Sequence, residues 1–163
     1  MVLKAGRAIP ASHKILTSIG YGSTLYPSGN GNLSEGFGSS VPRNLGNPLT
    51  KGIDITQWHT YNVSAKTNQW SARINGQVQL QATSNTVFFN TNTWSPPQLG
   101  SSYYSFDGQI AEVIIYDRVL SHEERTGAQS YLQQKHRLDD DPPVITILLP
   151  TNTNLIDSQI ILP

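Results

Sequence analysis

The chain has 163 residues, which is enough for one domain with a single hydrophobic core. Its 11 basic and 11 acidic side chains cancel, and the charged fraction of 13% is about half the usual value, so no net field holds nucleic acid. The sequence has no Cys, which excludes disulfides, zinc-thiolate sites and thiol catalysis, and it has no apolar run long enough for a membrane-spanning helix.

The first 52 residues begin with two strand-like segments, 1–5 and 14–21. Residues 22–52 are rich in Gly, Ser, Asn and Pro, which favour turns. We therefore expect long loops there, with at most one short strand.

A three-stranded meander is predicted in the centre of the chain. Its strands are 57–66, 69–74 and 77–82. The last two are joined by Asn75-Gly76, a pair that favours the type I′ turn of tight hairpins.

Two further strands are expected, at 86–90 and 109–117. In the second segment, Ala111, Val113 and Ile115 alternate with the residues between them, which is the period of a strand.

A helix is predicted over residues 119–138, where the charged side chains concentrate. Ser121 and Glu124 have the spacing of a capping box, and Lys135 and Arg137 suit the negative end of the helix dipole. One apolar side of this helix is expected to pack on a sheet.

The end of the chain reads as a linker followed by a β tail. Residues 139–143 are acidic and proline-rich, whereas 144–163 hold two apolar β segments. Such a tail is too short to bury a core alone, so we expect it to pair with a sheet of the same molecule or of a neighbour. The apolar residues of this assembly tail are Val144, Ile145, Ile147, Leu148, Leu149, Leu155, Ile156, Ile160 and Ile161.

Three stretches together resemble a known family. They are Trp58-His59, Ile74-Asn75-Gly76-Gln77 and the string FDGQIAEVIIYDRVLS at 106–121. The sequence is similar to the laminin-G-like, concanavalin A-like jelly rolls of bacterial extracellular proteins, over roughly 50–138 and more weakly before that. The resemblance implies an all-β, antiparallel jelly-roll β-sandwich, here with one C-terminal α-helix and an extended β tail. It also implies an adhesion or glycan-binding module at an extracellular or cell-surface location.

This resemblance divides the chain into a jelly-roll domain at 1–138, a linker at 139–143 and the tail at 144–163. The family normally has strands ahead of the one that 1–5 resembles, so a sheet with an open edge is expected. The tail is expected to fill such a gap, in its own domain or in the next subunit, and donation between subunits would build a fibre. Alternatively, the tail is the first strand of a following immunoglobulin-like domain, which it also resembles.

Catalysis has little support in the sequence. The family's glucanases use a strand of the form E-x-D-x-x-E, which is missing here, and the four His residues lack zinc-binding spacing. The isolated strand carboxylate, Glu112, is expected to pair with Arg118 or Arg73. The prediction is a protein that is not an enzyme and needs no cofactor.

A calcium ion is the remaining metal hypothesis, because some members of the family hold one at the rim of the sandwich. Asp107 and Asp54 are the candidate ligands. The alternative is that both side chains cap turns.

Glycan binding would require exposed aromatic rings. The candidates are Trp94, Tyr103 and Tyr104 in a loop-rich region, whereas Trp58 and Trp70 lie at strand positions and are expected in the core. Asn32 and Asn62 begin acceptor motifs for N-glycosylation.

Two functions follow from these features. The first is a non-catalytic structural module that assembles with other copies of itself through the tail. The second is a carbohydrate-binding accessory module of a larger secreted protein.

Overall fold

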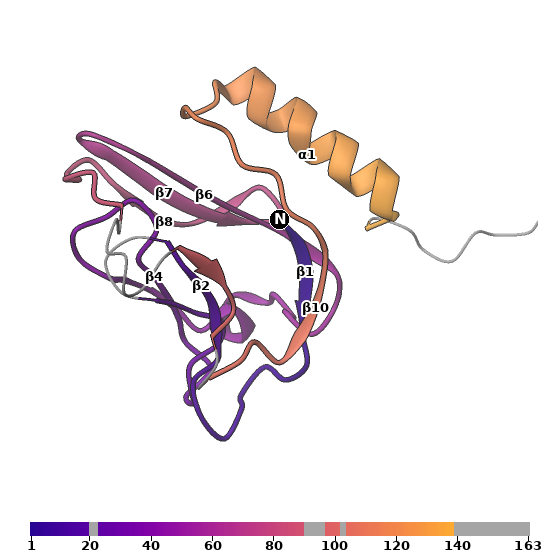
Figure 1. Cartoon of the computed structure of the whole chain (residues 1–163). Helices are drawn as coiled ribbons and strands as arrows, with labels where there is room; N and C mark the ends of the chain where they lie inside the picture. The colour runs from indigo at the N-terminus through magenta and orange to yellow at the C-terminus, as the bar shows by residue number, and fades with distance from the viewer. Residues whose placement is uncertain (20–22, 90–96, 102–103, 139–163) are drawn as a thin grey trace, which may run out of the picture.

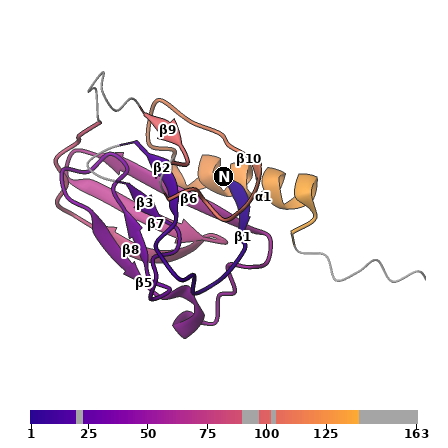
Figure 2. The ribbon, with the colours of Figure 1, turned by 60° about the horizontal axis from the view of Figure 1, so that its bottom comes forward.

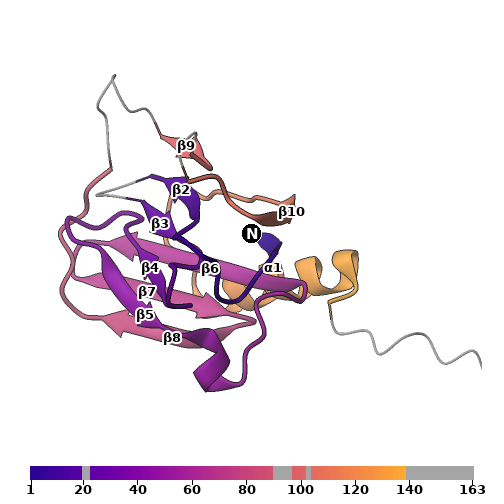
Figure 3. The ribbon, with the colours of Figure 1, turned by 90° about the horizontal axis from the view of Figure 1, so that it is seen from below.

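The computed structural model describes residues 1–19, 23–89, 97–101 and 104–138, and these form two antiparallel sheets and one long helix. The first sheet contains β1 (Val2–Ala5), β6 (His59–Lys66), β7 (Gln69–Ile74), β8 (Gln77–Ala82) and β10 (Gly108–Glu112). The second contains β2 (Ile15–Ser18), β3 (Thr24–Leu25), β4 (Leu33–Glu35), β5 (Arg43–Gly46) and β9 (Gln98–Leu99). Their orders are β10-β1-β6-β7-β8 and β5-β4-β3-β2-β9. This arrangement confirms the expected jelly-roll β-sandwich, whose sheets face each other in Figures 1 and 3.

The hydrophobic core lies between the two sheets. Trp70 of β7, Leu33 of β4 and Tyr26 are fully buried there, and the Trp70 indole N–H donates to the Phe37 carbonyl at 2.9 Å. The prediction that Trp70 is a core residue is thus confirmed. Because the indole nitrogen is paired, its burial carries no penalty for an unmet hydrogen bond.

The carboxyl group of Glu35 is buried in this core, between the two sheets. Oε1 of Glu35 accepts from the Thr24 hydroxyl at 2.7 Å and from the Phe37 N–H at 2.8 Å, and Oε2 accepts from the Tyr61 hydroxyl. Burial raises the pKa of Glu35, and these hydrogen bonds oppose that rise. The network joins β3 and β4 of one sheet to β6 of the other.

The central meander forms as predicted. Strand β6 pairs with β7 from Tyr61 opposite Ile74 to Lys66 opposite Gln69. Asn75 and Gly76 both have positive φ, 48° and 77°, as the type I′ turn requires.

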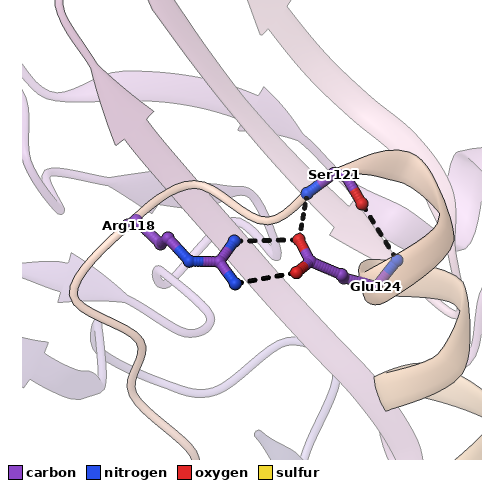
Figure 4. Close-up of polar contacts among 3 residues, drawn as sticks. All are labelled: Arg118, Ser121 and Glu124. Atoms are coloured by element: carbon purple, nitrogen blue, oxygen red, sulfur yellow. Dashed lines mark hydrogen bonds and ion pairs between the residues drawn. The ribbon is translucent and has the colours of Figure 1, made fainter.

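The helix α1 (His122–His136) lies on the outer side of the sheet that contains β6, as Figures 1 and 2 show. The predicted capping box is confirmed: the Glu124 N–H donates to Ser121 Oγ at 3.2 Å, and the Ser121 N–H donates to the Glu124 carboxylate at 2.9 Å (Figure 4). Arg118 donates to both oxygens of the same carboxylate, at 2.7 and 2.8 Å.

The other end of α1 is tied to the sheet by Glu112. Its carboxylate lies 2.7 Å from His136 Nε2 and 3.1 Å from Lys135 Nζ. The expectation that Glu112 pairs with Arg118 or Arg73 is wrong, because the helix returns its basic C-terminal turn to the end of β10. The chain therefore leaves α1 beside Glu112.

Residues 22–52 are more regular than expected. They contain β3, β4, β5 and a 3-10 helix (Pro48–Lys51), so the prediction of long loops with at most one strand is wrong. These strands have two to four residues, too few to show an alternation, and β4 places the polar Glu35 in the core.

Two further strand predictions, on the other side of the meander, also differ from the structure. The first is wrong and the second is too long. Residues 86–89 form no strand, and residue 90 lies outside the described residues. The segment 109–117 is a strand only as far as Glu112, where its pairing with β1 ends at Val2. Residues 113–117 have the strand pattern, but none of the described strands pairs with them.

Candidate functional site

The most distinctive feature of the surface is an interruption in the first sheet. Strand β1 fills the space between β6 and β10, with Leu3 opposite both His59 and Ile110. This pairing stops at Tyr61, whose N–H donates to the Met1 carbonyl at 2.9 Å and whose carbonyl accepts from the Met1 amine at 2.8 Å. Beyond the pair of Tyr61 and Met1, residues 62–66 of β6 lie on one side of a gap in the sheet and residues 113–117 lie on the other. We call the space between these two segments the strand slot.

The β6 side of the strand slot is an unpaired backbone edge. Tyr61 turns its N–H and C=O toward Met1, so the same groups of Val63 and Ala65 point into the slot, two and four residues further along. Residues 62–66 pair with β7 on their other side, and no strand in the described part of the chain pairs with them here. Such an edge is a template for another strand.

The strand slot opens into an apolar cavity of about 980 Å³. On its inner side, Val63 and Ala65 of β6 pack against the core, so side chains from the slot would reach the interior of the sandwich. On its outer side, the cavity is lined by Ala128 and Leu132 of α1. It is therefore walled by a sheet on one face and by a helix on the other.

The opposite wall exposes apolar side chains. Ile115 is 72% exposed and Val113 is 40% exposed, although both belong to a segment with the alternation of a strand. Both line the cavity. The pairing of β10 with β1 ends at Glu112, before the chain reaches these two residues.

One polar atom in the strand slot has no partner. The Oδ1 atom of Asn62 is buried and accepts no hydrogen bond from the residues that the structure describes. A buried carbonyl oxygen without a donor costs about 1–3 kcal/mol. A donor brought into the slot would remove that cost.

The geometry of the strand slot suits one kind of ligand. It combines free N–H and C=O groups with an apolar inner wall, as in sheets that bind an extended peptide by strand addition. Extended polypeptide satisfies both requirements, because its backbone pairs with the edge and alternate side chains enter the cavity.

Of the three predicted aromatic residues, Trp94 and Tyr103 fall outside the described residues. Tyr104 is 43% exposed, and its ring lies 4.0 Å from that of His13. Trp58 is 37% exposed with the Lys4 ammonium 5.1 Å from its ring centre, so the expectation of a core position is wrong. It precedes β6 and lies beyond the paired part of the sheet.

The two candidate calcium ligands differ in their hydrogen bonds. Asp54 accepts from the Thr56 N–H at 2.9 Å and from the Thr56 hydroxyl at 2.6 Å, and these bonds lower its pKa. The backbone carbonyl of Asp107 accepts from the Gly6 N–H at 2.6 Å. Within the ranges that the structure describes, no three His, Asp or Glu side chains gather closely enough to hold a metal ion.

The remaining sequence candidates have varied positions. Asn32 is half-buried just before β4, and Asn62 lies in the strand slot. The assembly tail lies outside the described residues. Among the described residues, no helix is long and apolar enough to cross a membrane.

Sequence reasoning missed the residues that line the strand slot. The signal was a mismatch of lengths: 57–66 and 109–117 are long strand patterns, whereas 1–5 between them is short. Only the order of the strands shows that these three segments are neighbours.

A family model described as Laminin_G_3, concanavalin A-like lectin/glucanases superfamily, matches residues 7–124, which is most of the chain. Comparison with curated proteins and with solved structures found no match.

Proposed function

The chain belongs to the concanavalin A-like lectin/glucanases superfamily, and on that premise we propose that it is a non-catalytic interaction module that binds an extended polypeptide strand in the strand slot. A domain of this superfamily fits carbohydrate binding or another interaction role. Laminin G-like domains are generally non-catalytic, although the superfamily includes glucanases, and they are typically extracellular. We place this protein outside the cell or at its surface on that basis.

The observation that carries this proposal is the unpaired edge of β6 beside an apolar cavity. Val63 and Ala65 present backbone N–H and C=O groups that no described strand pairs, and their side chains contact the core. An added strand gains main-chain hydrogen bonds and buries apolar side chains in the same step.

The carboxyl groups at the cavity support a role without catalysis. Glu35 is fully buried and accepts hydrogen bonds from Thr24, Tyr61 and Phe37, so its oxygens are engaged in holding the sheets together. The other carboxylate that lines the cavity, Asp117, lies in the exposed wall. A retaining or inverting glycosidase needs two carboxylates that face one bond from opposite sides.

The test is amide hydrogen exchange of the full chain over a range of protein concentrations. We expect the Val63 and Ala65 amides to be protected when a strand fills the slot, because their N–H groups point away from β7 and into the slot. Free exchange of both amides at every concentration would contradict the proposal.

A matched pair of proline variants separates binding from folding. Val63→Pro removes an N–H that points into the slot, whereas Ser64→Pro removes one that faces Ser71 of β7. We expect Val63→Pro to keep the unfolding midpoint near that of the wild type and to abolish protection of Ala65. Ser64→Pro is expected to lower the midpoint clearly.

Glycan binding is a second candidate, which one observation favours. The Tyr104 ring is exposed beside the His13 ring, and sugars stack on such aromatic surfaces. Binding to a glycan array that disappears in Tyr104→Ala would support this function. Binding that the substitution leaves unchanged, or no binding to any glycan, would count against it.

A further inference from the structure

We propose that the buried pair of Tyr26 and His59 is an acid-sensitive latch between the two sheets, which opens when the His59 ring takes up a proton. His59 begins β6 of the first sheet, and Tyr26 directly follows β3 of the second. The latch goes beyond the proposed function, because neither of its residues belongs to the strand slot.

The hydrogen bonds of His59 require a neutral ring. Its Nδ1 atom lies 2.8 Å from the carbonyl oxygen of Gln57, which can only accept, so Nδ1 carries the hydrogen. Nε2 lies 2.6 Å from the hydroxyl oxygen of Tyr26 and, in the neutral ring, accepts from that hydroxyl. A proton on Nε2 takes this acceptor away. Among the residues that the structure describes, the Tyr26 hydroxyl then has no other acceptor within hydrogen-bond distance.

The surroundings of the pair are unfavourable for a charge. Tyr26 is 0% exposed and His59 is 1% exposed. The Tyr26 ring meets the rings of Tyr61 and Phe106 edge-on, with ring centres 5.0 and 6.4 Å away. No carboxylate in the described part of the chain lies within ion-pair distance of His59. A protonated ring therefore gains solvation only by moving away from Tyr26.

The charged groups around His59 do not compensate for its burial. Burial is the largest cause that lowers the pKa of His59 below its ordinary value of 6.5, and the Met1 amine adds to this lowering. A backbone hydrogen bond and the charge of Asp54 act in the other direction and are outweighed. Two further titratable groups of the core, Tyr61 and Glu35, are bonded to each other. The ring is therefore held neutral by its position in the core.

Other contacts keep the sheets together when the latch opens. The Tyr61 hydroxyl, two residues along β6, donates to Glu35 of β4, and the Trp70 N–H donates to the Phe37 carbonyl at 2.9 Å. Neither contact involves an imidazole. We therefore expect a local separation of Tyr26 and β3 from β6, rather than unfolding of the sandwich.

The sign of the pH dependence follows from the direction of the shift. Because the pKa of His59 is lower in the folded state, its contribution to stability is present above pH 6.5 and is lost as the pH falls below that value and through the folded-state pKa. Burial raises the pKa of Glu35 above 4.5, so this carboxyl group contributes stability at low pH that is lost as the pH rises. The two effects oppose each other, and only a comparison with a His59 variant isolates the latch.

The first measurement compares the wild type with His59→Gln, whose amide can accept from Tyr26 at every pH. We expect the ratio of their urea unfolding constants, wild type over variant, to rise by up to about ten-fold for each pH unit below 6.5 and to level off at the folded-state pKa. The matched control is Val63→Ala, which removes part of a core side chain from the same strand and no titratable group. Its ratio to the wild type should be the same at every pH. A ratio for His59→Gln that does not change with pH would overturn the latch.

The second measurement needs no variant and follows the His59 ring of the full chain by NMR as the pH is lowered. We expect the nuclear Overhauser contacts between the Tyr26 and His59 rings to disappear with the same midpoint as the protonation of His59. The Trp70 indole N–H should stay protected from exchange at that pH, since its bond to Phe37 remains. Ring contacts that persist after His59 is protonated would overturn the proposal. So would loss of Trp70 protection at the same midpoint, because the whole sandwich would then unfold as one unit.

Discussion

The first sheet has a closed half, in which β1 pairs with both β6 and β10, and a half that contains the strand slot, in which it does not. In the closed half, β1 lies between β6 and β10, and its own residue Leu3 is fully buried. In the half that contains the strand slot, the continuations of the same two neighbours, 62–66 and 113–117, face each other without it. Ile110 pairs in a strand, whereas Ile115 is 72% exposed. The two halves therefore differ in their pairing with β1 rather than in the local sequence of their strands.

The largest expected effect lies in the closed half, where Leu3 of β1 is replaced by Ala. This change leaves a cavity in the hydrophobic core, so we expect a loss of about 2–5 kcal/mol in the free energy of unfolding. Urea denaturation followed by far-UV circular dichroism measures it. A loss below about 1 kcal/mol would mean that this half is not the stable part of the sheet.

A smaller effect is expected at the polar network that joins the sheets. In Glu35→Gln, one oxygen becomes an NH₂ donor that faces the donors Thr24, Tyr61 or Phe37. We expect about 1–3 kcal/mol of destabilisation by the same urea measurement. The control is Thr56→Ser, which keeps the hydroxyl that bonds the exposed Asp54.

The helix that covers the strand slot has its own pH dependence. Hydrogen bonds from Arg118 are the largest of the causes that lower the pKa of Glu124 to about 2, from an ordinary value of 4.5. A pKa lowered in the folded state gives stability that is present above pH 4.5 and is lost as the pH falls toward 2. We expect wild type to unfold at a higher temperature than Glu124→Gln at pH 6, with the difference closing over that range. A difference that does not change with pH would contradict this role of the carboxylate.

The smallest effect on stability is expected in the exposed wall of the slot. Ile115→Ser removes a side chain with little contact, so the free energy of unfolding should change by less than about 0.5 kcal/mol. Protection of the Val63 and Ala65 amides from hydrogen exchange should nevertheless weaken, because a strand in the slot would cover this side chain. If stability fell as much as in Leu3→Ala, residues 113–117 would belong to the core and the two halves would be alike.

Much of the fold followed from local residue patterns, and the exceptions have physical causes. The meander, the turn at Asn75 and the capping box of α1 depend on residues close together in the sequence, so they were predictable. The strands within 22–52 were missed because they are short and because Glu35 enters the core with its own hydrogen-bond donors. Residues 113–117 were predicted as strand because the alternation was real, but a strand needs a neighbour as well as a pattern.

The candidate site was harder to predict than the fold. Apart from Asn32 and Asn62, noted only as glycosylation motifs, the sequence candidates were exposed aromatics, acidic side chains and the tail, since these residue types carry recognisable chemistry. The slot has no such signature: its binding groups are main-chain N–H and C=O of Val63 and Ala65, which every residue possesses. Its apolar walls read in the sequence as ordinary core.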